Sequence, residues 1–466
     1  MLPDKMKVLE WLSVRKLLLS FLLFFALYIF FSGNWLRTRY PMQMDANGYY
    51  IYLPAAFIYH DLAKLSFVDQ MPEQFDRKYF LYRNHKGGYL SKYSPGAAIF
   101  QLPFFLAAHV LSPLFDFEQS GYSPPYRLAI ALSSLVYTVL AFWLLARILA
   151  GYFSRAAVML TVASLFLGTN VLFYGVLQAG VTHNYLLFVF VLMVFALDKW
   201  WKGGSSWYFV LACACVGMST TIRPTEILTG LVPLSFLWQK FSSGKLVKQR
   251  FIPGLSEIAF GFLAFVLAVL PVFLFWKYST GNWISYTYEQ EGFYFDRPSQ
   301  IWYGLLGFRK GWFIYTPLAA IAVAGIFLIR KDSSLMPWRR ALLLYLPVNI
   351  YIVLSWYCWW YGGGFGQRSF IPSYAILAIP LALVFEKMSE LPKTWLVLPA
   401  LLIALNLFQS FQYQRQIIHM DAMTWDAYRF IFGKWSLTDA EKKHRNTLLE
   451  YPDYLERGKK LNEYFK

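Results

Sequence analysis

The chain has 466 residues, of which 58% are hydrophobic and 15% are charged, and its formal net charge is +17. Soluble domains are about half apolar and about a quarter charged, so this composition excludes an ordinary soluble enzyme. It favours a protein with many membrane-crossing helices. The basic residues are dispersed among short loops, which fits membrane topology and anionic lipid better than nucleic acid.

Apolar runs of about 20 residues, long enough to cross a bilayer, recur along the chain. They predict an all-α membrane protein with about eleven transmembrane helices. The expected spans are residues 17–36, 126–148, 156–177, 183–200, 206–222, 225–239, 254–277, 313–329, 341–357, 370–385 and 394–411. The basic loops "QKFSSGKLVKQR" and "RKDSSLMPWRR" then face the cytoplasm, as the positive-inside rule requires, and so does the N-terminus.

The segment between the first two expected spans, residues 37–125, is a long outer loop that we expect to carry juxtamembrane helices. Within it, "SPGAAIFQLPFFLAAHVLSPLF" is apolar enough to cross the membrane. A crossing there would place every later basic loop outside. We therefore expect residues 94–115 to lie along the outer surface or to re-enter the membrane partway.

The chain is expected to divide into a transmembrane domain, residues 1–411, and a short helical tail outside the membrane, residues 412–466. In the tail, Thr438 is followed three residues later by Glu441. This is the pattern of a capping box, and it predicts the start of a helix.

One acid and a set of cations lie close to the first expected span. Asp45 follows that span among small and aromatic residues, where a solvated loop acid or a helix cap is the ordinary interpretation. The stretch "YRNHKGGYLSKYSPG" then places Arg83, Lys86 and Lys92 around two glycines. Cations on a flexible backbone near a membrane suit a phosphate group, and binding to anionic lipid headgroups is the alternative.

Further polar side chains lie at the ends of expected spans. His183 and Asn184 begin the span at 183–200, where a lone histidine is more often structural than catalytic. Arg223 and Glu226 interrupt an otherwise continuous apolar run. Charged side chains at membrane depth are costly and mark a polar cavity or pathway. The alternative is an internal ion pair that closes a helical hairpin.

Two carboxylates, Glu289 and Glu291, follow the span at 254–277. On a strand they would point the same way and be able to hold a divalent ion. No Asp-x-Asp pattern stands there, so the indication of a metal is weak.

A run of glycines after residue 357 is surrounded by Trp360, Gln367 and Arg368. Arg368 is placed to contact a phosphate from the outer side, and an anchoring arginine at a helix end is the alternative. Under the expected topology, all of these polar groups face the same side. That agreement favours one shared outer cavity.

Four local features together resemble the GT-C superfamily of integral-membrane glycosyltransferases, which use polyprenyl-phosphate sugars. Relatives include the protein O-mannosyltransferases and the aminoarabinose transferase of lipid A. The resemblance in layout covers most of residues 15–390. The features are the acid Asp45, "KYSPG" at 92–96, "TIRPTE" around Arg223, and "GFRKGWFIYTP" at 307–317 paired with "WWYGGGFGQRSFIP" at 359–372.

The resemblance implies a GT-C fold and an inverting transfer of a sugar to a glycan, lipid or protein acceptor on the outer face of the cell membrane. Asp45 would be the general base, and the implied catalytic residues are Asp45, His183 and Glu289. By the resemblance, Lys92, Arg223 and Arg368 would contact the donor phosphate, and the neighbouring cations Arg83 and Lys86 are expected to join them. The expected substrate cavity comprises Tyr49, Tyr93, Asn184, Glu226, Glu291, Trp360 and Gln367. No cofactor and no metal site are expected, although a divalent metal stays open.

Three other functions fit parts of the pattern. A transporter or flippase for lipid-linked sugar would also need outer cations, but it should carry ionisable groups near the midplane and paired repeats. An O-antigen polymerase or ligase relies on arginine-rich outer loops and needs no acid after the first span. A non-catalytic membrane scaffold predicts that Asp45→Asn leaves function intact.

Overall fold

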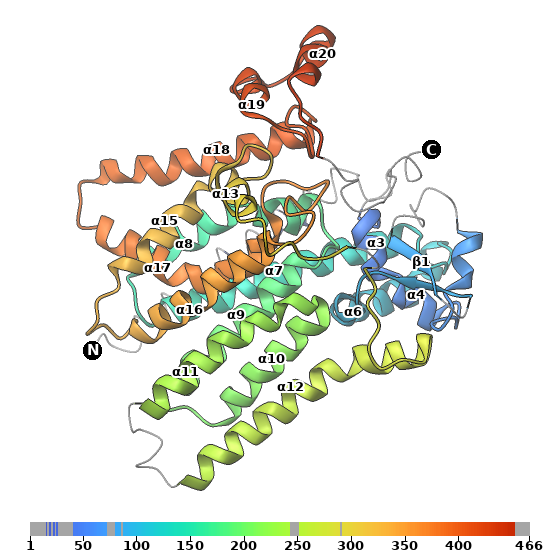
Figure 1. The fold of residues 1–466 in the computed structure, drawn as a ribbon, viewed down its shortest axis with the longest axis horizontal. Helices are drawn as coiled ribbons and strands as arrows, with labels where there is room; N and C mark the ends of the chain where they lie inside the picture. Colours follow the sequence, from blue (N-terminus) through green and yellow to red (C-terminus); the bar gives the residue numbers. More distant parts are fainter. Residues whose placement is uncertain are drawn as a thin grey trace. The chain divides into compact units, whose positions relative to one another are not determined.

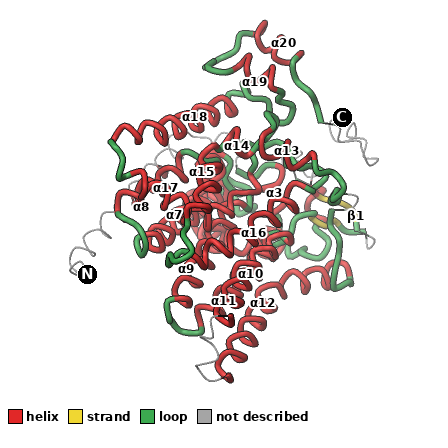
Figure 2. The backbone as a smooth tube through the Cα atoms, turned by 60° about the vertical axis from the view of Figure 1, so that its left-hand side comes forward, coloured by secondary structure: helices red, strands yellow, loops and turns green. Residues whose placement is uncertain are grey.

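The computed structural model describes residues 41–71, 80–84, 87–242, 251–288 and 291–452, together with isolated helical positions between residues 15 and 26. These parts are mostly helical, with one two-stranded sheet (Figures 1 and 2). The expectation of a helical protein is confirmed. The first expected span, 17–36, lies largely outside the described residues.

Six described helices are long and apolar enough to cross a membrane. They are Gly96–Phe115, Pro124–Leu149, His183–Trp201, Gly254–Thr280, Arg368–Met388 and Lys393–Gln414. Three shorter apolar helices are Arg155–Leu167, Trp207–Ile222 and Pro317–Leu328. The chain therefore carries several membrane-length apolar helices, while the expected count of about eleven spans stays a prediction.

The chain divides into two compact units. The first comprises Met1–Leu145 and Tyr174–Glu289, and the second comprises Ala146–Phe173 and Gln290–Lys466. The described part of the tail groups with the second unit. The division expected from sequence, at residue 411, stays a prediction.

The first unit opens with short elements and continues with long helices. The short elements are α3 (Met44–Tyr50), α4 (Tyr52–Phe57), η1 (Ser66–Gln70) and the antiparallel strands β1 (Leu81–Arg83) and β2 (Tyr89–Ser91). The helices that follow are α6 (Gly96–Leu111), η3 (Ser112–Phe115), α7 (Pro124–Leu149), η4 (Phe173–Leu177), α9 (His183–Trp201), α10 (Trp207–Ile222), η5 (Pro224–Gly230), α11 (Leu231–Ser242) and α12 (Phe251–Thr280), with α7 and η4 reaching into the second unit. Helices were expected in the outer loop, but the β-hairpin was not.

Small residues allow α10 to pack closely against α12. A Cβ atom on Gly217 would lie 2.5 Å from the carbonyl oxygen of Phe265, and one on Gly261 would lie 2.9 Å from the sulfur of Cys213. Glycines at such contacts let membrane helices approach backbone to backbone. The packed α9, α10 and α12 form the helical scaffold of this unit.

Helix α6 begins where α9 starts and α10 ends. The ring of Phe100 lies 5.9 Å from that of Tyr185, near the start of α9. At the other end of α6, Nδ1 of His109 lies 2.6 Å from the hydroxyl of Tyr126, near the start of α7. Because Gly96–Phe115 is also one of the helices long and apolar enough to cross a membrane, the expectation that it lies along the surface or re-enters stays a prediction.

The second unit is built around α17 (Tyr374–Met388), which packs against α8 (Arg155–Leu167) and α15 (Pro317–Gly325). Glu386 on α17 accepts hydrogen bonds from the backbone nitrogen and hydroxyl of Ser154, at 3.0 and 2.6 Å. A carboxylate at the start of α8 satisfies free N–H groups and favours the helix dipole. The other elements are α13 (Ser299–Leu306), α14 (Trp312–Tyr315), η6 (Ile326–Leu328), α16 (Met336–Leu354), η7 (Arg368–Ser373), η8 (Lys393–Leu396), α18 (Val397–Gln414), α19 (Trp425–Ile431) and α20 (Asp439–Thr447).

Two expected spans are wrong as continuous helices. The span expected at 156–177 stops as α8 at Leu167, and Gly168, a poor helix former, follows as the C-cap residue. The span expected at 313–329 breaks at Thr316, whose φ of −140° and ψ of 68° are not helical. Proline disfavours a helical conformation in the residue before it, and Pro317 follows Thr316.

The expected helix start in the tail is confirmed. Thr438 caps α20 by accepting a hydrogen bond from the backbone nitrogen of Glu441, and the Glu441 carboxylate accepts one from the backbone nitrogen of Thr438. This reciprocal pair is a complete capping box.

Candidate functional site

Asp45 lies in the first turn of α3, one residue after a strained position. Met44 has a φ of 44°, which is rare for a bulky residue and costs about 1 kcal/mol. The N-cap position is Gln43, so Asp45 is not the helix cap. Strained backbone of this kind concentrates at functional sites, where surrounding contacts hold it in place.

The carboxylate of Asp45 is hydrogen-bonded to a tyrosine distant in sequence. The hydroxyl of Tyr93 donates to Oδ1 of Asp45 at 2.5 Å. The Tyr93 ring lies 4.4 Å from the ring of Tyr49, and the ammonium of Lys92 lies 5.3 Å from the Tyr93 ring centre. Gly48 lies beneath this ring, because a Cβ there would come within 2.4 Å of it. The expected residues Asp45, Tyr49, Lys92 and Tyr93 therefore do come together.

Residues 91–96, which we call the strap, join α3 to the end of α10. On one side, the hydroxyl of Ser91 donates to the carbonyl oxygen of Gly48 at 3.0 Å. On the other, the hydroxyl of Ser94 donates to the carbonyl oxygens of Thr221 and Ile222, at 2.7 and 2.9 Å. The strap thereby connects Tyr93, and the Asp45 that Tyr93 bonds, to Ile222, the residue before Arg223.

Arg223 ends α10 in an extended conformation and pairs with a buried acid. Its guanidinium lies 4.0 Å from the carboxylate of Glu226, and the two side chains are 17% and 6% exposed. It also donates to the hydroxyl of Thr182 at 3.3 Å. The ion pair considered from sequence is thus present, at the break between α10 and η5.

A second connection runs from Arg223 back to α3 through the loop before α9. Thr182, which accepts from Arg223, follows Gly180 by two residues. Gly180 has a φ of 90°, and a Cβ there would lie 3.3 Å from that of Ala46. Because Ala46 adjoins Asp45, the loop and the strap link the carboxylate and the guanidinium along two routes.

His183 and Asn184 lie in the interior of the first unit. His183 is 1% exposed, and its ring meets that of Tyr174 at 5.2 Å. The side-chain nitrogen of Asn184 donates to the hydroxyl of Thr138 at 2.5 Å. Both side chains therefore help to pack α9 against its neighbours, and their expected substrate roles stay predictions.

The segment before Glu289 packs against the strap. The hydroxyl of Thr287 donates to the carbonyl oxygen of Lys92 at 2.7 Å, and the rings of Tyr288 and Tyr93 lie 6.3 Å apart. Glu289 itself lies outside the described residues, as does Lys86.

Arg83 belongs to the β-hairpin. Its guanidinium donates to the hydroxyl of Tyr89 at 3.5 Å, and that hydroxyl donates to Asp69 at 2.7 Å. These contacts give Arg83 hydrogen-bonding partners within the hairpin region. Its expected contact with a donor phosphate stays a prediction.

The remaining expected residues belong to the second unit. Gln367 is buried and donates from its side chain to the carbonyl oxygen of Trp359 at 2.9 Å. Arg309 stands over the ring of Trp360, 5.5 Å from its centre. With Glu291 and Arg368 in the same unit, the cavity expected to join all of these residues to Asp45 stays a prediction.

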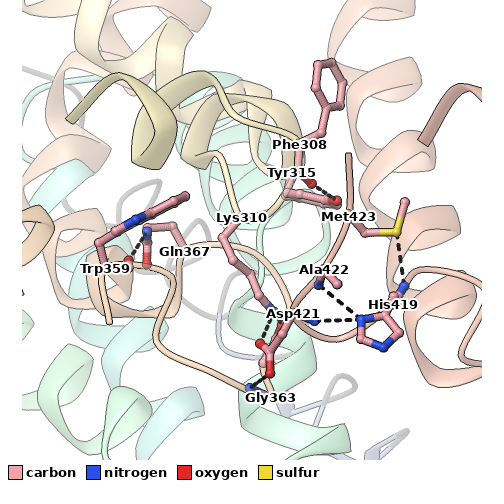
Figure 3. A network of polar contacts seen from close by, with 11 residues as sticks. Phe308, Lys310, Tyr315, Trp359, Gly363, Gln367, His419, Asp421, Ala422 and Met423 are labelled. Atoms are coloured by element: carbon pink, nitrogen blue, oxygen red, sulfur yellow. Dashed lines mark hydrogen bonds and ion pairs between the residues drawn. The ribbon is translucent and has the colours of Figure 1, made fainter. Parts of the chain in front are cut away.

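The second unit also holds a polar network that the sequence did not reveal (Figure 3). Lys310 is 2% exposed, and its ammonium donates to the carbonyl oxygen of Gly364 and lies 4.0 Å from Oδ1 of Asp421. The other oxygen of Asp421 accepts from the backbone nitrogen of Gly363 at 3.3 Å. Burial lowers the pKa of Lys310 to about 8, opposed by Asp421. Lys310 thus joins the two motifs that the resemblance had paired.

His419 completes this network as a neutral ring. Burial lowers its pKa, and the charge of Arg445 lowers it further. Its Nδ1 accepts from the backbone nitrogens of Asp421 and Ala422, at 3.2 and 3.1 Å (Figure 3). An accepting Nδ1 requires the tautomer with its proton on Nε2. Through Asp421 and Lys310, the network therefore fixes the tail to Gly363 and Gly364, which is a structural role.

No family model matches the chain, and no curated protein matches it either. The resemblance to the GT-C superfamily therefore stays a prediction from the motifs and their spacing. Within the described ranges, no group of three or more His, Cys, Asp or Glu side chains is arranged to hold a metal ion. Because Glu289 lies outside those ranges, the question of a metal is untested.

Proposed function

We propose that this protein is an inverting, integral-membrane glycosyltransferase that transfers a sugar from a polyprenyl-phosphate donor to an acceptor hydroxyl. The observation that carries the proposal is the strap, whose hydrogen bonds connect the carboxylate of Asp45 to the end of α10 that bears Arg223. A base and a set of cations are the two elements that sugar transfer from a phosphate requires.

The proposed chemistry is a single displacement. Asp45 accepts the proton of the acceptor hydroxyl, and the acceptor oxygen forms a bond to the anomeric carbon as the bond to the phosphate oxygen breaks. The electron pair leaves with the polyprenyl phosphate, whose growing charge is met by Lys92 and Arg223. Attack opposite the leaving group inverts the anomeric carbon.

The proposed topology follows the positive-inside rule. The chain crosses the cell membrane about eleven times from a cytoplasmic N-terminus, which places the α9 start, the α10 end and the strap on the extracytoplasmic side. A lipid-linked donor would enter from the bilayer, and a polar acceptor from the aqueous side. The acceptor is a glycan, a lipid or a protein.

The test compares wild type with Asp45→Asn, purified in detergent, using radiolabelled polyprenyl-phosphate hexoses and a membrane extract as acceptor. We expect Asp45→Asn to lower transfer by about 10³-fold, as for loss of a general base. Asp116→Asn is the matched control, because it neutralises an exposed acid in the same loop segment. Equal transfer by wild type and Asp45→Asn would remove Asp45 from catalysis.

Two further arms separate the alternatives. Each assay is repeated with EDTA, and loss of transfer would establish a metal requirement. Wild type is also reconstituted in proteoliposomes with the labelled donor in one leaflet. Movement of the lipid across the bilayer without transfer of its sugar would identify a flippase and overturn the glycosyltransferase proposal.

A further inference from the structure

The hydrogen bond between Tyr93 and Asp45 sits inside a larger set of restraints on the tyrosine. Its ring rests on Gly48, at a position where a Cβ would come within 2.4 Å, and is flanked by the ring of Tyr49 at 4.4 Å. Its backbone nitrogen donates to the hydroxyl of Ser91 at 3.3 Å, and its carbonyl oxygen accepts from the hydroxyl of Tyr52. The phenol therefore reaches Asp45 from a fixed direction.

The carboxylate that receives this bond lies on a short helix that does little by itself to orient it. The N-cap residue Gln43 makes no side-chain capping bond, and the preceding Met44 is in the left-handed region. Asp45 is part-exposed, so its χ angles are not fixed by burial. The bond of 2.5 Å from Tyr93, whose ring packs on Gly48 and Tyr49, restrains the direction of this carboxylate.

The neighbouring cation strengthens the donor. Lys92 stands 5.3 Å from the centre of the Tyr93 ring. A positive charge beside a phenol polarises its O–H group and favours donation to a carboxylate. The same lysine is expected to contact the donor phosphate. Tyr93 therefore contacts both Asp45, the proposed base, and Lys92, which would neutralise the leaving phosphate.

We propose that Tyr93 is a positioning residue for the Asp45 base, which its hydroxyl holds ionised and aimed at the acceptor. This inference rests on the proposed glycosyl transfer. Tyr93 itself exchanges no proton in the reaction: its O–H bond stays intact while the acceptor proton moves to Asp45. A hydrogen bond donated to the charged form of an acid favours ionisation, so the bond extends the pH range over which Asp45 is able to act.

The test is the pH–activity profile of Tyr93→Phe, which keeps the ring on Gly48 and removes only the hydroxyl. We expect the acidic limb of the profile to move upward by about one pH unit and the maximal rate to fall about tenfold, with little change in KM for the donor. Tyr185→Phe is the control. It removes a buried hydroxyl that bonds Ser133 in the same unit, and its profile should match wild type.

A purely space-filling tyrosine would not shift the profile. Gly48→Ala adds an independent arm, because its Cβ displaces the Tyr93 ring and so moves the hydroxyl away from Asp45 without removing it, and it should shift the acidic limb in the same direction. A wild-type profile and rate in Tyr93→Phe, with Asp45→Asn inactive, would overturn this inference alone. Full activity of Asp45→Asn would instead overturn the proposed function.

Discussion

Gly96 lies so close to Thr221 that a Cβ atom on this glycine would come within 2.3 Å of the Thr221 carbonyl oxygen. The first turn of α6 and the last turn of α10 therefore meet backbone to backbone, and the hydroxyl of Ser94 bonds the same carbonyl oxygen at 2.7 Å. This contact fixes the end of the strap against the residue before Arg223. Any side chain at position 96 must open it.

The first prediction concerns Gly96→Ala. Backbone atoms are unable to move aside as a flexible side chain does, so the added methyl should push α6 from α10 and lower the free energy of unfolding by about 1–3 kcal/mol. The displaced strap should also lower transfer activity about 100-fold, since misplacement by about 1 Å is costly in catalysis. Denaturation in detergent and the transfer assay measure the two effects.

Gly292→Ala is the matched control for Gly96→Ala. A Cβ on Gly292 meets nothing within 4 Å, so this variant should keep the stability and activity of wild type. If Gly96→Ala behaves like Gly292→Ala, the close contact between α6 and α10 does not fix the strap.

The second prediction separates two roles of Arg223. Arg223→Met leaves the buried carboxylate of Glu226 without its cation and should destabilise the protein by about 3 kcal/mol. The double variant Arg223→Met/Glu226→Gln removes both charges and should recover most of that loss. The rate of sugar transfer should be about 100-fold below wild type in the single and the double variant, because both lack the Arg223 guanidinium that would stabilise the charge of the leaving phosphate.

The double variant is the decisive member of this set. Recovery of activity together with stability would show that Arg223 serves only the ion pair. Recovery of stability without recovery of transfer activity would indicate that Arg223 contacts the donor phosphate. Thermal melting and donor titration of the same preparations make the comparison direct.

Sequence patterns predicted the local features well. The apolar run at 183–200 became α9, and the run at 206–222 became α10, which stops at Ile222 before Arg223. These boundaries depend on residues a few positions apart, such as the charged residue and proline that follow α10. The tail helix start at Thr438 was predictable for the same reason.

The contacts that build the candidate site were harder to predict. Tyr93 and Asp45 are 48 residues apart, and Lys310 and Asp421 also come from separate segments, so no local period marks either pair. The β-hairpin that leads into the strap was not predicted, although Tyr82 and Tyr89 stand on the two sides of Gly87 and Gly88. Gly-containing turns between such runs are the usual hairpin signal.

The third prediction concerns the pH dependence of stability at Lys310. Burial holds the pKa of this ammonium at about 8, below its ordinary value of 10.5. Between these values the unfolded chain binds a proton that the folded protein does not. Stability from this group therefore rises as pH increases through that window and is lost as pH falls through about 8.

The comparison for Lys310 uses Lys310→Met/Asp421→Asn, which removes both charges and leaves no buried ion alone. We expect wild type to gain thermal stability relative to this variant between about pH 8 and pH 10.5, by an amount on the order of 3 kcal/mol. Melting curves of both proteins across the range give the difference. A constant difference would show that Lys310 does not titrate in the folded state in this window.

The fourth prediction concerns acid sensitivity of the tail. Glu441 accepts hydrogen bonds from Lys434, at 2.7 Å, and from Thr438, and these partners lower its pKa from 4.5 to about 2. The stabilisation is complete above about pH 4.5 and is lost as pH falls through 2, because the unfolded tail takes up the proton first. Cleavage by pepsin within α20 should therefore accelerate steeply as the pH is lowered from 4 toward 2.

Glu441→Gln should be cleaved at pH 4 as fast as wild type is at pH 2, because the amide lacks the charge that Lys434 pairs with. Glu390→Gln, an exposed position in the second unit, should leave the wild-type pH dependence unchanged. Cleavage of all three proteins at the same rate throughout would mean that the capping box does not limit opening of α20. A shift confined to Glu441→Gln would assign that opening to this one carboxylate, because the backbone of α20 is otherwise the same in all three proteins.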